Sequence, residues 1–287
     1  MALWERKECT TPRGLFLYTA LRGTLLVMKK NIVIANWKMN PQKLADAKKI
    51  LVGTVKQTAG MKTVQTVVCP PAIFLPELAR TVKGAGAPRL GVQDLFHEAS
   101  GAYTGQTSPQ MAKQFKATWA ILGHSERRER GEDNDTVGRK VRYALAEGYT
   151  AVLCIGERER NEEGAHYTFV RDELEAVFAG LKRKDLARLV IAYEPVWAIG
   201  KRAEEAMQTH ELYEMALFIR KLLIERFGRK PAEEVAVLYG GSVKPENAEQ
   251  IVREGGVDGL LVGSASLDPK QFGDIVRAVA VAKAPIS

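Results

Sequence analysis

Glu194 is the residue whose type and position could most directly do chemistry. It stands at the end of an apolar run that begins at Leu189 and is rich in β-branched residues, which is typical of a buried strand. Pro195 stiffens the chain directly after the carboxylate, and Gly200 restores its freedom a few residues later. The pattern predicts a proton-abstracting base on a rigid edge with a mobile lid attached to it. A solvated glutamate at a strand end before a turn would have the same pattern.

Lys38 and His124 follow two other apolar runs. Lys38 comes just after residues 32–36 and would offer a fixed cation there, although an ordinary surface lysine would fit equally well. His124 directly follows residues 119–123, the only one of the four histidines to follow such a run directly. Its place at a predicted helix start favours the neutral imidazole over the imidazolium. A lone histidine can also be a purely structural hydrogen-bonding group.

Two glycine-bearing turns close the last two apolar runs. One includes Gly240, Gly241 and Ser242, and the other includes Gly263 and Ser264. Each turn opens onto a predicted helix, so that its backbone amides could bind an anion. Such loops, after the seventh and eighth strands, are where phosphate sites of parallel barrels tend to lie.

Together these groups suit one type of reaction, proton transfer next to the carbonyl of a small phosphorylated sugar. Glu194 would remove the carbon-bound proton. His124 and Lys38 would stabilise the enediolate oxygens, and the glycine turns would bind the phosphate. The sequence has no metal-ligand cluster and no nucleotide fingerprint, so neither a metal nor a cofactor is expected.

The elements that must position these residues alternate along the chain. Short apolar runs predict strands at 32–36, 64–69, 89–93, 119–123, 151–155, 189–194, 235–239 and 259–262. Longer periodic segments predict helices at 41–58, 137–147, 169–181, 207–227, 245–254 and 269–281. We expect an α/β protein with a single (β/α)8 barrel, because candidate residues recur at the ends of several strands. An open doubly wound sheet, the alternative, gathers its site at one switch point.

Composition limits the other function classes. The 287 residues have a net charge of +8 and a pI near 9.3, but the basic residues are scattered without an aromatic platform, which argues against nucleic-acid binding. A small anionic substrate fits this charge. Cys9, Cys69 and Cys154 form neither a zinc pattern nor a disulfide framework. Their spacing favours a reducing compartment, which we expect to be the cytoplasm.

Residues 1–27 differ from the rest of the chain. Their apolar stretch is interrupted by Arg22 and lacks a small-residue cleavage site, so it is a poor secretory signal, and it is too short to span a membrane. Met28 offers a second start just before the first strand. We expect residues 1–27 to be an extension outside the fold, with a targeting peptide as the lesser possibility, and residues 28–287 to be the barrel domain.

Residues 28–287 resemble the triosephosphate isomerase family over essentially their whole length. The motifs that carry the resemblance are Asn36-Trp37-Lys38-Met39-Asn40, Gly123-His124-Ser125-Glu126-Arg127-Arg128, Ala192-Tyr193-Glu194-Pro195-Val196-Trp197-Ala198-Ile199-Gly200 and Tyr239-Gly240-Gly241-Ser242-Val243. The family is itself a standard example of a glutamate base beside a neutral histidine under a closing loop. The resemblance implies a cofactor-free isomerase of glycolysis and gluconeogenesis that interconverts dihydroxyacetone phosphate and D-glyceraldehyde 3-phosphate.

It also implies the site. The catalytic residues would be Glu194, His124, Lys38, Asn36 and Glu126. Substrate would be bound by Asn36, Lys38, Gly200, Ser242, Gly263 and Ser264. The resemblance further implies a homodimer through residues 101–108, in which Thr104 braces Asn36 and Glu126 of the other subunit.

Three departures from the family pattern stand out. Asp94 follows Gln93 where Asn is usual, which we expect to be a tolerated polar change. Ser264 replaces a usual glycine, so a positive φ there would cost about 1 kcal/mol or more. After Gly200 the family continues with Thr-Gly or Ser-Gly, whereas Lys201, Arg202 and Ala203 follow here. We therefore expect a shortened lid that lacks the glycine amide which meets the serine matching Ser242.

These departures leave three hypotheses. The first is an active isomerase with an altered lid. The second is a non-catalytic phosphometabolite-binding barrel whose lid has decayed, although Lys38, His124 and Glu194 all remain. The third is another phosphosugar isomerase, such as a phosphoribosyl aldose–ketose isomerase, which would use a different pair of acid and base residues.

Overall fold

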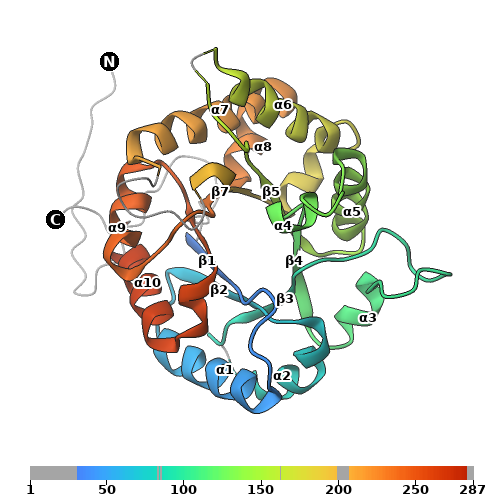
Figure 1. Cartoon of the computed structure of the whole chain (residues 1–287), viewed down its shortest axis with the longest axis vertical. Helices are drawn as coiled ribbons and strands as arrows, with labels where there is room; N and C mark the ends of the chain where they lie inside the picture. The colour runs from blue at the N-terminus through green and yellow to red at the C-terminus, as the bar shows by residue number, and fades with distance from the viewer. Residues whose placement is uncertain (1–30, 83, 85, 162, 199–206, 283–287) are drawn as a thin grey trace, which may run out of the picture.

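The apolar runs of the sequence fold as eight parallel strands in the computed structural model, which describes residues 31–82, 84, 86–161, 163–198 and 207–282. The strands are β1 (Asn31–Asn36), β2 (Val64–Cys69), β3 (Arg89–Val92), β4 (Ala117–Leu122), β5 (Thr150–Ile155), β6 (Leu189–Tyr193), β7 (Ala236–Tyr239) and β8 (Gly259–Val262). Each strand pairs with its successor, and β1 also pairs with β8, so the sheet closes on itself (Figure 1). The predicted (β/α)8 barrel is confirmed, and an open sheet is excluded.

Helices surround the barrel on its outer face (Figure 1). Within the described residues they are α1 (Leu44–Thr58), α2 (Leu75–Thr81), α3 (Pro109–Lys113), α4 (Ser125–Arg128), α5 (Asn134–Ala146), α6 (Ala165–Phe178), α7 (Thr209–Phe227), α8 (Arg229–Glu234), α9 (Pro245–Glu254) and α10 (Pro269–Ala282). The long helices match the predicted segments with ends shifted by a few residues. The short helices α2, α3, α4 and α8 were not predicted, because one or two turns show too little of the 3.6-residue period.

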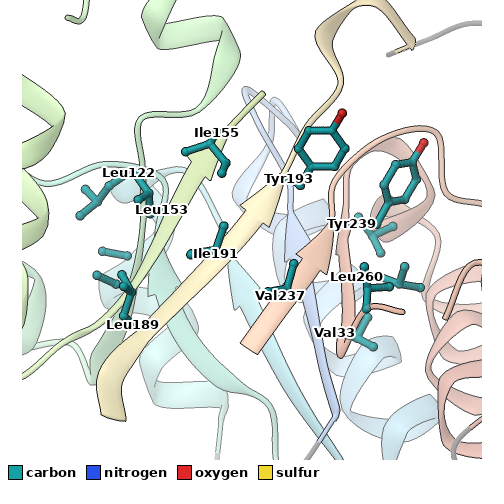
Figure 2. Packing of buried hydrophobic residues seen from close by; sticks show 14 of the residues in the cluster. Val33, Leu122, Leu153, Ile155, Leu189, Ile191, Tyr193, Val237, Tyr239 and Leu260 are labelled. Atoms are coloured by element: carbon teal, nitrogen blue, oxygen red, sulfur yellow. The ribbon is translucent and has the colours of Figure 1, made fainter. Parts of the chain in front are cut away.

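Two apolar layers stabilise this arrangement. The inner layer fills the barrel and includes Ile34, Cys154, Val190 and Leu238. The outer layer packs the opposite faces of the strands against the helices. Figure 2 shows strand residues that belong to this layer, such as Ile191. Truncating a fully buried aliphatic side chain of this kind to alanine costs about 2–5 kcal/mol, so both layers contribute strongly to stability.

The alternation of strand side chains decides which residues reach the interior of the barrel. In β6, Val190 and Ala192 belong to the inner layer, whereas Ile191 and Tyr193 belong to the outer one. The same alternation directs the next residue, Glu194, inward at the carboxyl end of the strand. The base candidate is therefore positioned by the register of a strand that is buried on both faces.

The segment between β3 and α3 projects from the barrel (Figure 1). Residues 101–106 at its tip are exposed, and a hydrogen bond from Phe96 N to Thr107 O (2.9 Å) closes its base. The Phe96 and Tyr103 rings lie 4.5 Å apart, so the loop has its own small packing contact. None of the described helices is long and apolar enough to cross a membrane. Residues 1–27, the predicted extension, lie outside the described part of the chain.

Candidate active site

Glu194 lies at the carboxyl end of β6 and is only 2% exposed. One carboxylate oxygen, Oε2, accepts a hydrogen bond from the Ser125 amide (3.3 Å), and the other, Oε1, lies 3.4 Å from His124 Nε2. Burial, and after it the nearby Glu194 carboxylate, raises the pKa of the Cys154 thiol, so this neighbour stays protonated. The Glu194 carboxylate therefore has only long contacts, with the Ser125 amide and with His124, and a substrate could replace them.

His124 reaches this carboxylate because Gly123 turns the chain at the end of β4. Gly123 has a φ of 71°, and a side chain there would also meet Val137 at 2.8 Å, so glycine is required. The next residue, His124, caps helix α4, and its Nδ1 accepts the Glu126 amide hydrogen at 3.2 Å. Because Nδ1 is an acceptor, the single ring proton lies on Nε2 and the imidazole is neutral. This geometry agrees with the neutral imidazole expected from the helix start.

Lys38 sits just beyond β1 in a left-handed backbone conformation, with a φ of 53°. Such a conformation costs a non-glycine residue about 1–2 kcal/mol, so the surroundings must hold it. Asn36 Oδ1 accepts the Lys38 amide hydrogen (3.1 Å), and the Gln93 side-chain amide donates to the Lys38 carbonyl (2.8 Å) and to the Cys69 carbonyl (2.9 Å). These bonds fix where the lysine side chain leaves the backbone.

The Lys38 ammonium pairs with Glu126, with 2.5 Å between Nζ and Oε1. Burial opposes ionisation of Glu126, but the Lys38 hydrogen bond and charge outweigh it and lower the pKa of this carboxyl. Lys38, Glu126, His124 and Glu194 therefore form one continuous series of contacts across the mouth of the barrel. The structure brings together the five residues predicted as catalytic, since Asn36 supports Lys38.

The glycine turns border the same mouth. A Cβ at Gly240 would lie 2.7 Å from Glu194 Cγ, so only glycine leaves room for the base. Ser242 Oγ lies 3.5 Å from the Ala198 carbonyl, and a Cβ at Gly263 would meet only Lys38 Cε, at 3.6 Å. Ser264 is exposed at the start of a short 3-10 helix (Ser264–Leu267), and its φ is not positive. The strain expected from a serine at this position is therefore absent.

Asp94, the residue expected as a tolerated change, has an ionic role. It accepts two hydrogen bonds from Lys140 Nζ (2.8 and 2.9 Å) and lies 2.7 Å from Arg127. Lys140 is only 3% exposed and also pairs with Glu132. Burial raises the pKa of Asp94 even though Lys140 and then Arg127 favour its charged form. The aspartate thus supplies a counter-charge for a buried lysine next to helix α4.

A second set of polar residues was missed from the sequence. Glu157 follows the end of β5 and accepts hydrogen bonds from Tyr193 Oη (2.9 Å) and Trp197 Nε1 (2.8 Å). Arg160 donates to Glu157 (2.8 Å), stacks over Trp197 and also pairs with Glu211 at the start of α7. The contacts fix the chain directly after Glu194. The signal was present, because Glu157 follows an apolar run and a glycine, as His124 does.

Comparison with known proteins decides the family. The family model described as triosephosphate isomerase matches residues 31–279. The triosephosphate isomerase of Caldanaerobacter subterraneus subsp. tengcongensis is 38% identical over 254 residues, which cover 87% of this chain and all of that protein. The chain belongs to the triosephosphate isomerase family. The resemblance, the fold and the isomerase function predicted from the sequence are thereby confirmed, and nothing favours a non-catalytic barrel.

The altered residues of the predicted lid in this triosephosphate isomerase family member fall outside the part of the chain that the structure describes. Gly200 and the altered lid residues Lys201, Arg202 and Ala203 lie outside the described residues, so the predicted shortening of the lid stays a prediction. Thr104 is exposed on the projecting loop. No group of three or more potential metal-ligating side chains occurs among the residues described.

Proposed function

We propose that the mouth of the barrel interconverts dihydroxyacetone phosphate and D-glyceraldehyde 3-phosphate through an enediolate. The observation that carries this proposal is the placement of a buried carboxylate, a neutral imidazole and an ammonium in one series of contacts. A base, a neutral donor and a cation are what proton transfer next to a carbonyl requires.

In the proposed reaction, Glu194 leaves the Ser125 amide and removes a proton from the carbon next to the substrate carbonyl. His124 Nε2–H donates to the oxygen on which negative charge develops, and the Lys38 ammonium stabilises that charge. His124 passes its Nε2 proton to this oxygen and takes the proton of the neighbouring hydroxyl, whose carbon becomes the new carbonyl carbon. Glu194 then returns its proton to the former carbonyl carbon, so the enzyme ends in its starting protonation state.

The phosphate would be bound by backbone amides of the two turns, at Ser242, Gly263 and Ser264, together with Gly200 of the lid. The position of Gly263 beside Lys38 supports this assignment, because it brings the turn after β8 next to the cation. Two positive features, amides and an ammonium, would then face the dianionic phosphate.

The working unit would be a homodimer. The exposed loop at residues 101–106 projects from the barrel, which supports insertion into another subunit, where Thr104 would brace Asn36 and Glu126 of the partner subunit. Cys69 and Cys154 are both free and buried, and free cysteines fit the reducing cytoplasm that we propose for this glycolytic enzyme.

A coupled assay with dihydroxyacetone phosphate tests the reaction. We expect turnover well above that of buffer, without added metal or cofactor. If turnover equals that of buffer while calorimetry shows binding of a phosphate ligand, the alternative of a phosphometabolite-binding barrel would replace the proposal.

A further inference from the structure

A buried carboxylate that the proposed reaction does not use lies next to the base. Glu173 of helix α6 is 2% exposed and borders a cavity of about 390 Å³, which Glu194 also lines. A buried carboxylate is costly unless it is paired, so its partners should indicate its role.

One oxygen of Glu173 fixes the backbone under the base. Oε2 accepts the Gly156 amide hydrogen at 2.8 Å. Gly156 packs so closely on the base that a Cβ there would lie 1.8 Å from the Glu194 carbonyl oxygen. The preceding residue, Ile155, accepts the Glu194 amide hydrogen at 2.7 Å. Any shift of the Gly156 peptide would therefore move the Glu194 backbone.

The other carboxylate oxygen of Glu173, Oε1, is linked to the end of β4 through the side chain of Arg128. Oε1 lies 3.2 Å from Arg128 Nε in an ion pair without a hydrogen bond, because Nε–H donates to the Gly123 carbonyl at 2.7 Å. The same guanidinium donates to the Cys154 carbonyl (3.3 Å) and to Asn134 (2.6 Å). Gly123 is the residue that turns the chain into His124.

We propose that Glu173 is a positioning residue, which fixes the separation of Glu194 and His124 by holding the ends of β5 and β4 at once. It touches neither substrate nor reacting atoms and acts through Gly156 and Arg128. The proposal rests on the roles proposed above for Glu194 and His124. A mismatch of about 1 Å between such groups can cost 10²-fold in rate, so a group that fixes both strand ends has a large effect on turnover.

The charge state of Glu173 depends on the groups around it. Burial raises its pKa to about 7, Arg128 and the Gly156 hydrogen bond oppose this, and Glu194 and Glu157 add to it. The other charged groups that line the cavity are Glu129, Glu132, Asp133 and Arg158.

The test compares three variants. Glu173→Leu removes both contacts, whereas Glu173→Gln keeps an acceptor for the Gly156 amide and loses the charge facing Arg128. The matched control is Asp258→Asn. Asp258 also accepts a backbone amide hydrogen (Val237, 2.9 Å) and pairs with an arginine (Arg220, 2.8 Å), but at the amino-terminal end of the barrel.

We expect Glu173→Leu to lower kcat by at least ~10-fold with KM changed by less than about 3-fold, and Glu173→Gln to recover most of this loss. Wild-type kcat should change between about pH 6 and 8 as Glu173 ionises, and Glu173→Gln should lack this change. Asp258→Asn should lose stability without losing kcat. In ¹⁵N-histidine NMR spectra the His124 ring resonances should shift in the Glu173 variants and not in the control.

A Glu173→Leu variant with wild-type kcat and an unmoved His124 resonance would overturn the proposal. If that variant fails to fold, Glu173→Gln decides, because an unchanged pH profile and His124 resonance would overturn it equally. The NMR measurement needs no turnover. A shifted His124 resonance in a chain without isomerase activity would therefore support the positioning role while contradicting the proposed reaction.

Discussion

At the scale of single residues, the site depends on the environment that each side chain is given. His124 is useful as a donor because its Nδ1 accepts the Glu126 amide hydrogen, which leaves the proton on Nε2 facing Glu194. Lys38 can serve as a fixed cation because two side-chain amides hold its unusual backbone. Hydrogen bonds with the backbone therefore set the tautomer of His124 and the position of Lys38, and the proposed reaction depends on both.

Glu194→Gln tests the base directly. The amide keeps the size of the side chain but cannot take up a proton, so we expect kcat to fall by about 10³-fold. The coupled assay measures the fall, and calorimetry with a phosphate ligand should show affinity close to that of the wild type. A kcat within a few fold of the wild-type value would assign the base to another residue.

Glu173 gives a pH dependence of stability with a definite sign. Its pKa is raised from the usual value of 4.5 to about 7, so between these pH values the folded chain binds more protons than the unfolded chain. Its stabilising contribution to the free energy of unfolding is therefore fully present below pH 4.5. It is lost as the pH rises through about 7, and the total loss is up to about 3 kcal/mol. Urea unfolding of wild type and Glu173→Gln across this range measures it. A constant difference between the two proteins would contradict the prediction.

At the scale of elements, the ends of neighbouring strands are packed against one another with no spare room. Gly156 after β5 and Gly240 after β7 both abut Glu194, one at its backbone and the other at its side chain. Helix α6 ties the ends of β4 and β5 through Glu173, and Glu157 ties the end of β5 to Trp197. The base is thus located by contacts from both adjacent strands.

Gly240→Ala should move the base. The added Cβ would lie 2.7 Å from Glu194 Cγ, so the side chain must shift. We expect kcat to fall by about 10- to 100-fold with a small change in KM, because the phosphate amides lie further along the turn. Steady-state kinetics together with thermal unfolding measure both effects. An unchanged kcat would show that Glu194 has more room than the structure gives it.

Asp94→Asn restores the residue usual in the family and should nevertheless destabilise this chain. Lys140, which is buried, and Arg127 each pair with both Asp94 and Glu132, and the change removes the Asp94 carboxylate from both cations. Breaking buried pairs costs about 3–5 kcal/mol, and since Glu132 remains we expect about 1–3 kcal/mol. Chemical denaturation measures the loss, and Asp274→Asn, which breaks an exposed ion pair, is the control. Equal stabilities of the Asp94 and Asp274 variants would refute the prediction.

At the scale of the whole molecule, the segment between β3 and α3 is longer and more exposed than a connection within a single barrel requires. The segment between β3 and α3 projects outward (Figure 1). Tyr103 and Thr104 on this segment are exposed. An exposed loop of this kind fits insertion into a second subunit better than service as a connection, because a shorter link would join β3 to α3.

Shortening the loop by removing residues 101–106 should therefore give a monomer with lower kcat. Sedimentation equilibrium measures the oligomeric state, and the coupled assay measures turnover. Replacement of the surface residue Tyr213, on α7, by serine is the control and should leave both unchanged. A dimer that survives the deletion with full activity would assign the subunit contact to another surface.

The sequence by itself determined the barrel and indicated most of the candidate catalytic residues. Eight apolar runs predict eight strands, and in a parallel barrel all carboxyl ends share one face, so Lys38, His124 and Glu194 were expected to lie near one another. Only the tertiary structure showed what surrounds them. Glu173 lies in a helical segment where surface charges are common, and nothing in its local pattern distinguishes a solvated carboxylate from a buried one. Asp94 and Glu157 each follow an apolar run, but their partners Lys140 and Trp197 come from other elements. The burial of these carboxylates, and the backbone position of Gly156 that Glu173 holds, result from contacts between elements far apart in the chain. Such contacts decide the separation and charge of the catalytic groups.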